Sequence, residues 1–266
     1  METYRLKNIA IVILLLLNAC LLLMVGQQQL QSLGAQRRAA AQLRELYTAS
    51  HLALNDRLEL DRKPLDILSP ARRPETEQAI TSALLGGEAL ATSQGGGIYS
   101  YEANGRTIQF RAGGSFYGSR LDLPVEDPAG FARSFCSRFG YEEPRLQLEG
   151  GSGTAVAGQL LRDVPVINCA VELYFEEGRL ISVTGAHVDL QDASLQPGDP
   201  MSCVTALIKF LDHRNTSGVV CSEVTGVECV YQLQSVSSPR LLPVWEISTD
   251  TYTYYVDCAT GEVYTH

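Results

Sequence analysis

Charged residues are scarce in this sequence, since Asp, Glu, Lys and Arg together make up only 19% of it. Positive charge is the scarcer sign, because 21 basic residues stand against 30 acidic ones and the formal net charge is −9. That balance disfavours nucleic acid and anionic lipid surfaces as partners. Hydrophobic residues reach 45%, which excludes a disordered protein and provides for one or two sizeable cores.

Recognisable catalytic motifs are missing as well. The glycine-rich residues 150–153 fail as a nucleophile elbow, because Thr154 stands where the last glycine is required. The sequence has no Walker lysine motif, no HExxH and no complete GxGxxG, so it predicts neither a phosphate cradle nor a zinc site, and no cofactor. His187 and Asp189 would share one face of a strand, which leaves an acid/base pair as an alternative, but a solvent-facing strand edge is favoured. We therefore expect a protein that is not an enzyme.

The cysteines show no CxxC pair, and their spacing is wide and irregular. Cys20 lies in the apolar N-terminal segment, and six more follow it: Cys136, Cys169, Cys203, Cys221, Cys229 and Cys258. An even number outside the membrane would suit disulfides. Buried free thiols are favoured over disulfides, because a domain of this size needs no staples and cysteine is among the most often buried residue types.

The one long apolar run covers residues 9–25. As a helix it is about 26 Å long, and its neighbours extend it toward the thickness of a hydrocarbon core, so residues 9–26 predict a transmembrane helix. Arg5 and Lys7 precede the run, which places residues 1–8 in the cytoplasm and the rest of the chain outside it. We expect retention as a single-pass anchor in the cell membrane, because no good signal-peptide cleavage site follows.

Two residues within this predicted span carry further expectations. Asn18 is polar at mid-span, so it is a candidate contact to a partner's transmembrane helix, although a single Asn is also tolerated unpaired. Leu17, Asn18, Ala19 and Cys20 resemble a lipobox, but the apolar residues after the cysteine disfavour lipidation.

The exterior begins with a helical pattern and a linker. Apolar residues at helical spacing between residues 27 and 54 predict a juxtamembrane helix, and a spacer is favoured over a partner-binding face. Three prolines in residues 61–74 predict an extended linker. We therefore divide the chain into residues 1–8, 9–26, 27–74, a first exterior module at 75–195 and a second module at 196–266.

The two modules are predicted from hairpins and helices. Tight turns at residues 104–105, 176–178 and 259–261 lie between alternating apolar runs and predict three hairpins. A short helical stretch is expected around residues 75–85, and Asp-Pro pairs open further helices at residues 127–139 and 199–213. The glycine-rich residues 149–158 are interpreted as a turn or bulged edge. The order predicts an α+β fold: a transmembrane helix followed by tandem helix-plus-antiparallel-sheet modules.

Aromatic residues crowd the last predicted hairpin. Most of them are expected in a core, and one or two exposed tyrosines would anchor a protein partner. The candidate exterior contacts are Trp245, Tyr252 and Tyr254.

These residues also carry a family resemblance. The basic N-terminus, the span ILLLLNACLLL, the run LYTASHLALNDRLEL and the proline-rich linker resemble the YycI branch of the YycH/YycI regulatory proteins of Gram-positive bacteria. The run LLPVWEISTDTYTYYVDCATGEVYTH looks like that family's closing strands and equally like a PepSY-type module, and VPVINCAVELYFEEGRLISVTG is similar to the corresponding earlier strands. The six exterior cysteines are not part of the family pattern.

The resemblance implies a non-enzymatic accessory protein of the cell membrane. Its expected partners are a sensor histidine kinase of the WalK/YycG type, whose control of cell-wall homeostasis it adjusts, and a YycH-like paralogue. It contacts them through its transmembrane helix and exterior domain, and it contacts the lipid bilayer through residues 9–26. The alternative is a PepSY-like inhibitor or chaperone module for an extracellular protease or cell-wall hydrolase.

Overall fold

The computed structural model describes residues 38–235 and 238–265. The predicted span at residues 9–26, with Asn18 and Cys20, therefore lies outside the described residues. Within the described ranges, no helix is long and apolar enough to cross a membrane.

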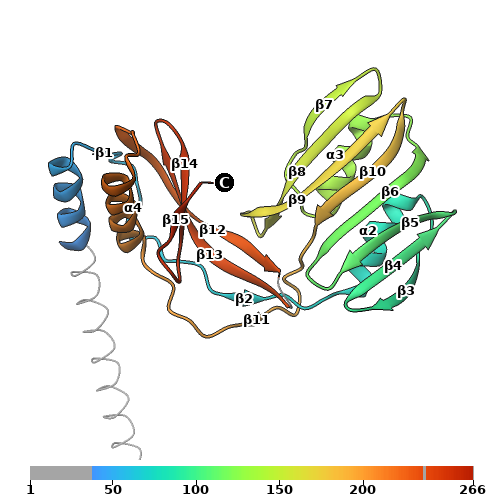
Figure 1. Cartoon of the computed structure of the whole chain (residues 1–266), viewed down its shortest axis with the longest axis horizontal. Coiled ribbons are helices and arrows are strands. Elements are labelled where there is room, and N and C mark those ends of the chain that lie inside the picture. The colour runs from blue at the N-terminus through green and yellow to red at the C-terminus, as the bar shows by residue number, and fades with distance from the viewer. Residues whose placement is uncertain (1–37, 236–237, 266) are drawn as a thin grey trace, which may run out of the picture.

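The fold is mixed α+β and is dominated by antiparallel sheet, as expected (Figure 1). Two lobes are visible, each a sheet with helices on one face. The first lobe contains, in chain order, α2 (Pro74–Leu85), β3 (Leu90–Gly95), β4 (Ile98–Ala103), β5 (Arg106–Arg111), β6 (Ser115–Pro124), α3 (Pro128–Arg138), β7 (Arg145–Glu149), β8 (Ser152–Leu161), β9 (Val164–Glu176) and β10 (Arg179–Ala186).

The second lobe is built from both ends of the described chain. It contains a helix over residues 38–49, followed by β1 (Ala53–Leu54), β2 (Leu68–Ser69), β11 (Ser194–Leu195), α4 (Cys203–Ser217), β12 (Glu223–Ser235), β13 (Pro239–Thr249), β14 (Thr253–Asp257) and β15 (Val263–Tyr264). The first lobe is thus inserted into the second. The sequence predicted two modules that follow each other in the chain, and this insertion shows that the prediction of a simple tandem order is wrong.

The helix expected within residues 27–54 is described from residue 38, and it is not the spacer that its sequence suggests. Leu43 and Tyr47 of this helix are buried in the second core, and the Tyr47 hydroxyl donates to the Leu207 carbonyl of α4 at 2.8 Å. Strand β1 then pairs in parallel with β12, with Ala53 opposite Glu223. Residues 38–54 therefore complete the second lobe.

All three predicted hairpins are confirmed. Strands β4 and β5 flank Asn104 and Gly105, whose φ angles of 52° and 74° are those that a tight primed turn requires. Strands β9 and β10 meet at residues 177–178, and β14 pairs with β15 around the turn at residues 259–261. The glycine-rich residues 149–158 form the β7–β8 turn and a bulge between Gly158 and Gln159.

Helix capping explains where the predicted helix starts hold and where they fail. Asp127 caps α3 by accepting from the Gly130 N–H at 3.0 Å, which confirms the helix expected at residues 127–139. Helix α4 starts later than expected, because Ser202 is its cap and accepts from the Thr205 N–H. The N–H of the preceding Met201 donates to the Cys258 carbonyl at 3.0 Å, and Ser202 itself has extended backbone.

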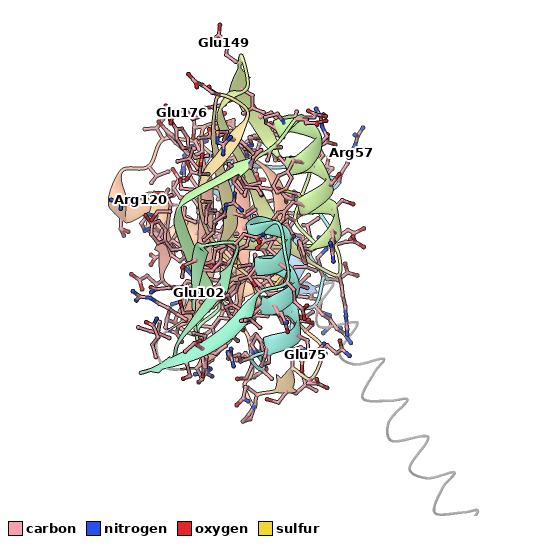
Figure 2. The ribbon with its side chains drawn as sticks, turned by 90° about the vertical axis from the view of Figure 1, so that its right-hand side faces the viewer. Arg57, Glu75, Glu102, Arg120, Glu149 and Glu176 are labelled. Carbon is pink, nitrogen blue, oxygen red and sulfur yellow. The ribbon has the colours of Figure 1, made fainter. Side chains whose placement is uncertain are left out.

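Three buried clusters hold the lobes together. The first packs α2 and α3 on the large sheet, the second packs α4 and residues 38–49 on β12–β14, and the third lies where the lobes meet. Five of the six described cysteines are buried and all six have free thiols, so the expected burial is confirmed except at the partly exposed Cys229. Charged side chains such as Glu102, Glu149 and Glu176 point outward (Figure 2).

Candidate functional site at the junction between the lobes

Two chain segments connect the lobes, and they run side by side. Residues 55–73 lead into the first lobe, and residues 187–202 lead back out of it (Figure 1). Within them β2 pairs with β11, with Ser69 opposite Ser194, and the Gln196 N–H donates to the Ile67 carbonyl at 2.9 Å. Strand β2 also pairs with β13, so each edge of this short strand is occupied. We call residues 55–73 the incoming strap and residues 187–202 the outgoing strap, and the two paired connections together the strap.

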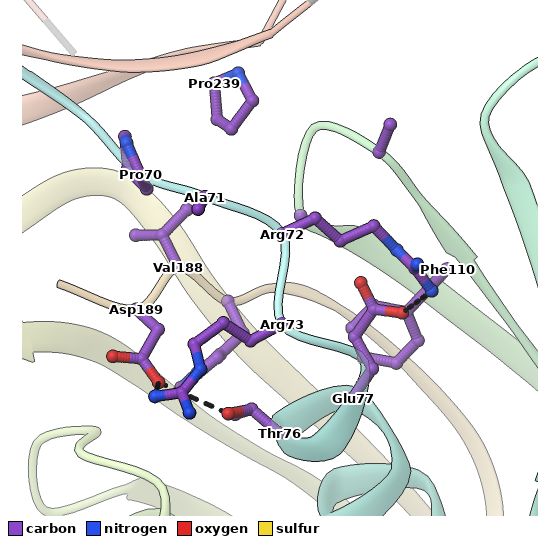
Figure 3. A pocket seen from close by; sticks show the side chains of 13 residues that line it. Pro70, Ala71, Arg72, Arg73, Thr76, Glu77, Phe110, Val188, Asp189 and Pro239 are labelled. Atoms are coloured by element: carbon purple, nitrogen blue, oxygen red, sulfur yellow. Dashed lines mark hydrogen bonds and ion pairs between the residues drawn. The ribbon is translucent and has the colours of Figure 1, made fainter. Parts of the chain in front are cut away.

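An arginine ties the two connections together at the first lobe. The Arg73 guanidinium lies 3.5 Å from the Asp189 carboxylate and also donates to the Gln191 side chain. Asp189 accepts in addition from the Thr76 hydroxyl at 3.2 Å (Figure 3). Thr76 belongs to the first turn of α2, so the incoming strap, the outgoing strap and the helix are joined at one carboxylate.

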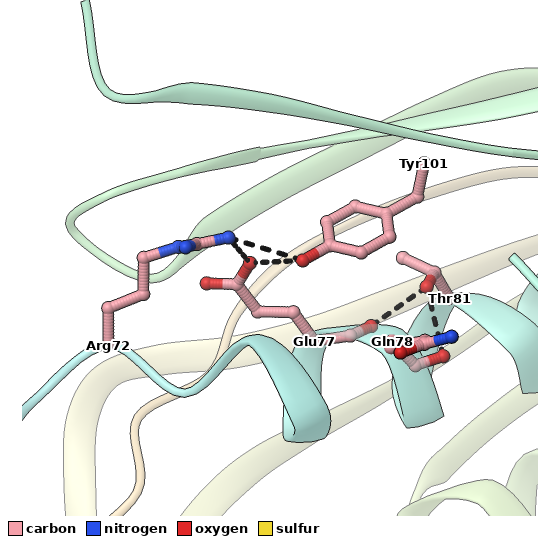
Figure 4. A network of polar contacts seen from close by, with 5 residues as sticks. All are labelled: Arg72, Glu77, Gln78, Thr81 and Tyr101. Carbon is pink, nitrogen blue, oxygen red and sulfur yellow. Dashed lines mark hydrogen bonds and ion pairs between the residues drawn. The ribbon is translucent and has the colours of Figure 1, made fainter. Parts of the chain in front are cut away.

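The neighbouring Arg72 enters a buried network on the other side of the strap. Its guanidinium donates to the Glu77 carboxylate at 2.6 Å and to the Tyr101 hydroxyl at 3.2 Å, and Tyr101 donates to the same carboxylate at 2.7 Å (Figure 4). Its guanidinium carbon also lies 3.3 Å from the Tyr99 ring centroid. Burial, and then the bond to Glu77, raise the pKa of Tyr101, so its hydroxyl stays a donor.

The two sheets meet along a narrow seam. Strands β9 and β12 share one backbone pair, Val166 with Tyr231. Beyond this pair, the Asn168 side chain replaces the backbone of a neighbouring strand. Its carboxamide donates to the Leu233 carbonyl and accepts from the Leu233 N–H, each at 2.7 Å. Contact between the sheets thus combines this one side chain with the surrounding apolar cluster.

Replacing Asn168 with alanine is expected to open this seam. Both backbone groups of Leu233 would lose their partner, which costs roughly 1–3 kcal/mol. Hydrogen exchange measured at the Leu233 amide should become about tenfold faster or more, while amides in the centre of β9 keep their protection. Asn215→Ala, on the exposed end of α4, is the control, and unchanged exchange at Leu233 in Asn168→Ala would refute the assignment.

His187 lies at the start of the outgoing strap and is half-buried. Its ring packs on Tyr141 with centroids 5.7 Å apart, and its Nδ1 is 3.2 Å from the Gln159 amide nitrogen. Gln159 is itself saturated, since it also bonds both backbone groups of Val188 and the Cys169 thiol. The prediction that His187 lies on a solvent-facing strand edge is therefore wrong. The contacts of Asp189 run to the strap and α2, so the alternative acid/base pair is not assembled by a hydrogen bond.

A pH dependence follows from this burial. Desolvation lowers the pKa of His187 from 6.5 to about 4, although nearby Asp189 opposes the shift. Between these values the unfolded chain binds a proton that the folded chain does not, so stability is present above pH 6.5 and falls as the pH drops toward 4. We expect a loss of roughly 1 kcal/mol per pH unit. Urea unfolding at several pH values should show a flatter dependence for His187→Gln, and equal slopes would contradict the prediction.

The candidate contacts chosen from the sequence fall in different places. Trp245 is fully buried and donates from Nε1 to the Met201 carbonyl at 2.9 Å, and Tyr254 is only 5% exposed against Phe210. Both are core residues rather than surface contacts, which corrects that expectation, because the alternate positions of β13 and β14 face α4. Tyr252 is 68% exposed and stays a prediction.

Sequence reasoning missed the residues of the junction. Arg72, Arg73 and Asn168 belong to no motif, and the adjacent arginines appeared only as part of a proline-rich linker. Their partners are distant in the chain, so no local pattern announces them. Among the described residues, no group of three or more His, Cys, Asp or Glu side chains is placed to hold a metal ion.

Comparison with known proteins gives no family assignment. No family model and no curated protein matches the chain. An uncharacterized protein from Eubacterium rectale is similar over 77% of this chain and 86% of its own, with a TM-score of 0.42 and 12% identity. The YpeB C-terminal domain of Bacillus megaterium is similar over 74% of this chain and 98% of its own, with a TM-score of 0.35 and 11% identity. Similarity at this level does not establish a family, so the resemblance to the YycI branch stays a prediction.

Proposed function

We propose that this chain is a membrane-anchored accessory regulator of a two-component sensor histidine kinase of the WalK/YycG type. It acts by protein–protein contact, through its transmembrane helix and its exterior lobes, and adjusts signalling in cell-wall homeostasis. The anchor and its orientation rest on the N-terminal sequence, in which Arg5 and Lys7 precede the apolar run.

The observation that carries the proposal is the packing of the helix at residues 38–49. This helix is the first described element after the predicted anchor, and Tyr47 fixes it to α4 by a buried hydrogen bond. A displacement that reaches residue 38 along the chain is therefore passed to a folded lobe. Such coupling between a membrane contact and an exterior domain is what a regulator of a membrane kinase requires.

The junction supports the proposal from the other side. Its titratable groups are engaged with one another, Arg72 with Glu77 and Arg73 with Asp189, in arrangements that stabilise the strap. Since the strap joins two lobes, this site is suited to holding or transmitting a relative position.

An exposed apolar pair on the second lobe offers an exterior contact. Tyr252 and Val220 are 68% and 83% exposed, and the Thr251 hydroxyl beside Tyr252 donates to the Val220 carbonyl at 3.2 Å. Large exposed apolar side chains that lie together are typical of protein-binding surfaces. This pair also suits the alternative function, an inhibitor or chaperone module that holds an extracellular hydrolase.

The test is co-purification of the full chain with a histidine kinase from native membranes. The chain is expected to co-purify with the kinase and to lose it when residues 9–26 are replaced by an unrelated span. Tyr252→Ala is expected to weaken the association. Leu90→Ala serves as the control, because Leu90 is equally exposed, at 72%, on the first lobe. Recovery of a hydrolase instead, unaffected by the span replacement, would favour the alternative, and recovery of neither would reject both.

A further inference from the structure

A groove follows the outgoing strap at residues 187–195. It consists of three hollows that share lining residues: a small one of about 30 Å³, shown in Figure 3, and two larger ones of about 300 Å³ and about 400 Å³. The two larger hollows share Leu161, Arg162 and Leu190, so they adjoin each other. Their sizes fall in the range of small-molecule sites.

The largest hollow is mainly apolar. Leu65 and Leu68 come from the incoming strap, Leu161 and Val164 from the β8–β9 hairpin, and Leu190 from the outgoing strap. Because β2 is paired on both edges, this strand offers side chains and no free edge to an extended peptide. Asp66 and the buried Tyr231 are among its few polar residues, so an aliphatic chain fits it better than a peptide backbone does.

The adjoining hollow is cationic in a chain that is acidic as a whole. Arg162 sits in the β8–β9 turn, where φ angles of 51° at Arg162 and 66° at Asp163 fix the backbone, and Arg138 comes from the last turn of α3. Neither guanidinium forms an ion pair within the part of the chain that the structure describes. The one carboxylate lining this hollow, Asp189, already pairs with Arg73. Two arginines are left to receive an anion.

We infer that this groove binds a single-chain anionic amphiphile, a fatty-acid carboxylate, with its alkyl chain in the apolar hollow and its carboxylate between Arg138 and Arg162. The inference is independent of the kinase proposal. Because the walls come from both straps, from the first lobe and from Tyr231 of the second, a ligand here contacts both lobes and both of their connections. Its binding stabilises the strap in the folded arrangement.

The test uses the full chain in phosphatidylcholine nanodiscs and a decanoate carrying a photoreactive diazirine. Irradiation followed by peptide mass mapping should place adducts on peptides that contain residues 65–68, 161–164 or 190–195. Removing one charge-assisted partner lowers affinity roughly tenfold, so Arg138→Glu and Arg162→Glu should each reduce these adducts by about that factor. Arg145→Glu, an exposed arginine on β7 outside the groove, should leave them unchanged.

A second probe isolates the role of the charge. The corresponding diazirine alcohol keeps the alkyl chain and removes the carboxylate, so it should label the groove weakly and without dependence on Arg138 or Arg162. Adducts confined to residues 1–37, adducts spread evenly over the chain, or equal labelling by acid and alcohol would each overturn the inference. Thermal unfolding of every variant confirms that the two exposed arginines were replaced without loss of the fold.

Discussion

Replacing Glu77 with alanine is expected to destabilise the first lobe by about 3–5 kcal/mol, because it leaves the Arg72 guanidinium part-buried without its counter-charge. Glu77 is only 7% exposed and accepts from both Arg72 and Tyr101. Removing it also leaves the Tyr101 hydroxyl, which lies in the core, without its acceptor. The loss is therefore much larger than for a surface ion pair, which is worth about 0–1 kcal/mol.

Urea unfolding of Glu77→Ala, followed by far-UV circular dichroism and by hydrogen exchange in α2 and β4, measures the effect. Tyr101→Phe is the graded control, since it deletes one hydroxyl and should cost roughly 1 kcal/mol. The double variant Arg72→Met with Glu77→Leu removes both charges and should recover most of the loss. A double variant as unstable as Glu77→Ala would show that packing, and not the unpaired guanidinium, causes the loss.

The same network shows where sequence analysis stops. Residues 62–73 contain no helix and carry only the short strand β2, as their prolines predict, but Arg72 contacts Tyr101 across 29 positions of the chain. No local pattern in the linker predicts that this arginine is buried, because an Arg among prolines is expected to be solvated. Its role exists only once α2 and β4 have packed.

Local signals were reliable for the elements themselves. Asn104 and Gly105 accept positive φ at little cost and fix a hairpin, and Asp127 before Pro128 fixes a helix start. Such devices act over a few residues and are written directly in the sequence. The α4 start was misplaced because Asp199 and Pro200 have the same local form, while the backbone of Met201 is engaged with Cys258.

Long-range assembly was not predictable in the same way. The insertion of the first lobe into the second rests on contacts such as Tyr47 with Leu207, 160 positions apart, and on the parallel pairing of β1 with β12. Similarly, the Asn168 clamp needs β12 to lie beside β9, which no periodicity specifies. The candidate site lies at the junction because this is where the long-range contacts converge.

Trp245→Ala is the second large effect, and it separates the core aromatics from the surface ones. Trp245 is completely buried beneath α4, and its Nε1–H binds the carbonyl of Met201, just before the helix cap. Truncation removes a large apolar surface, leaves a cavity and frees that carbonyl, so we expect about 3–5 kcal/mol of destabilisation. Because Met201 and Ser202 hold the start of α4, hydrogen exchange should rise first in that helix.

Two variants make this result specific. Trp245→Phe keeps most of the apolar volume and should lose clearly less than the alanine variant, since it forfeits one hydrogen bond and part of the packing. Tyr252→Ala, at a side chain that is 68% exposed, should change the free energy of unfolding by no more than about 0.5 kcal/mol while it weakens partner capture. A large loss of stability in Tyr252→Ala would mean that its proposed contact role cannot be separated from folding, whereas a small one in Trp245→Ala would show that α4 does not depend on this anchor.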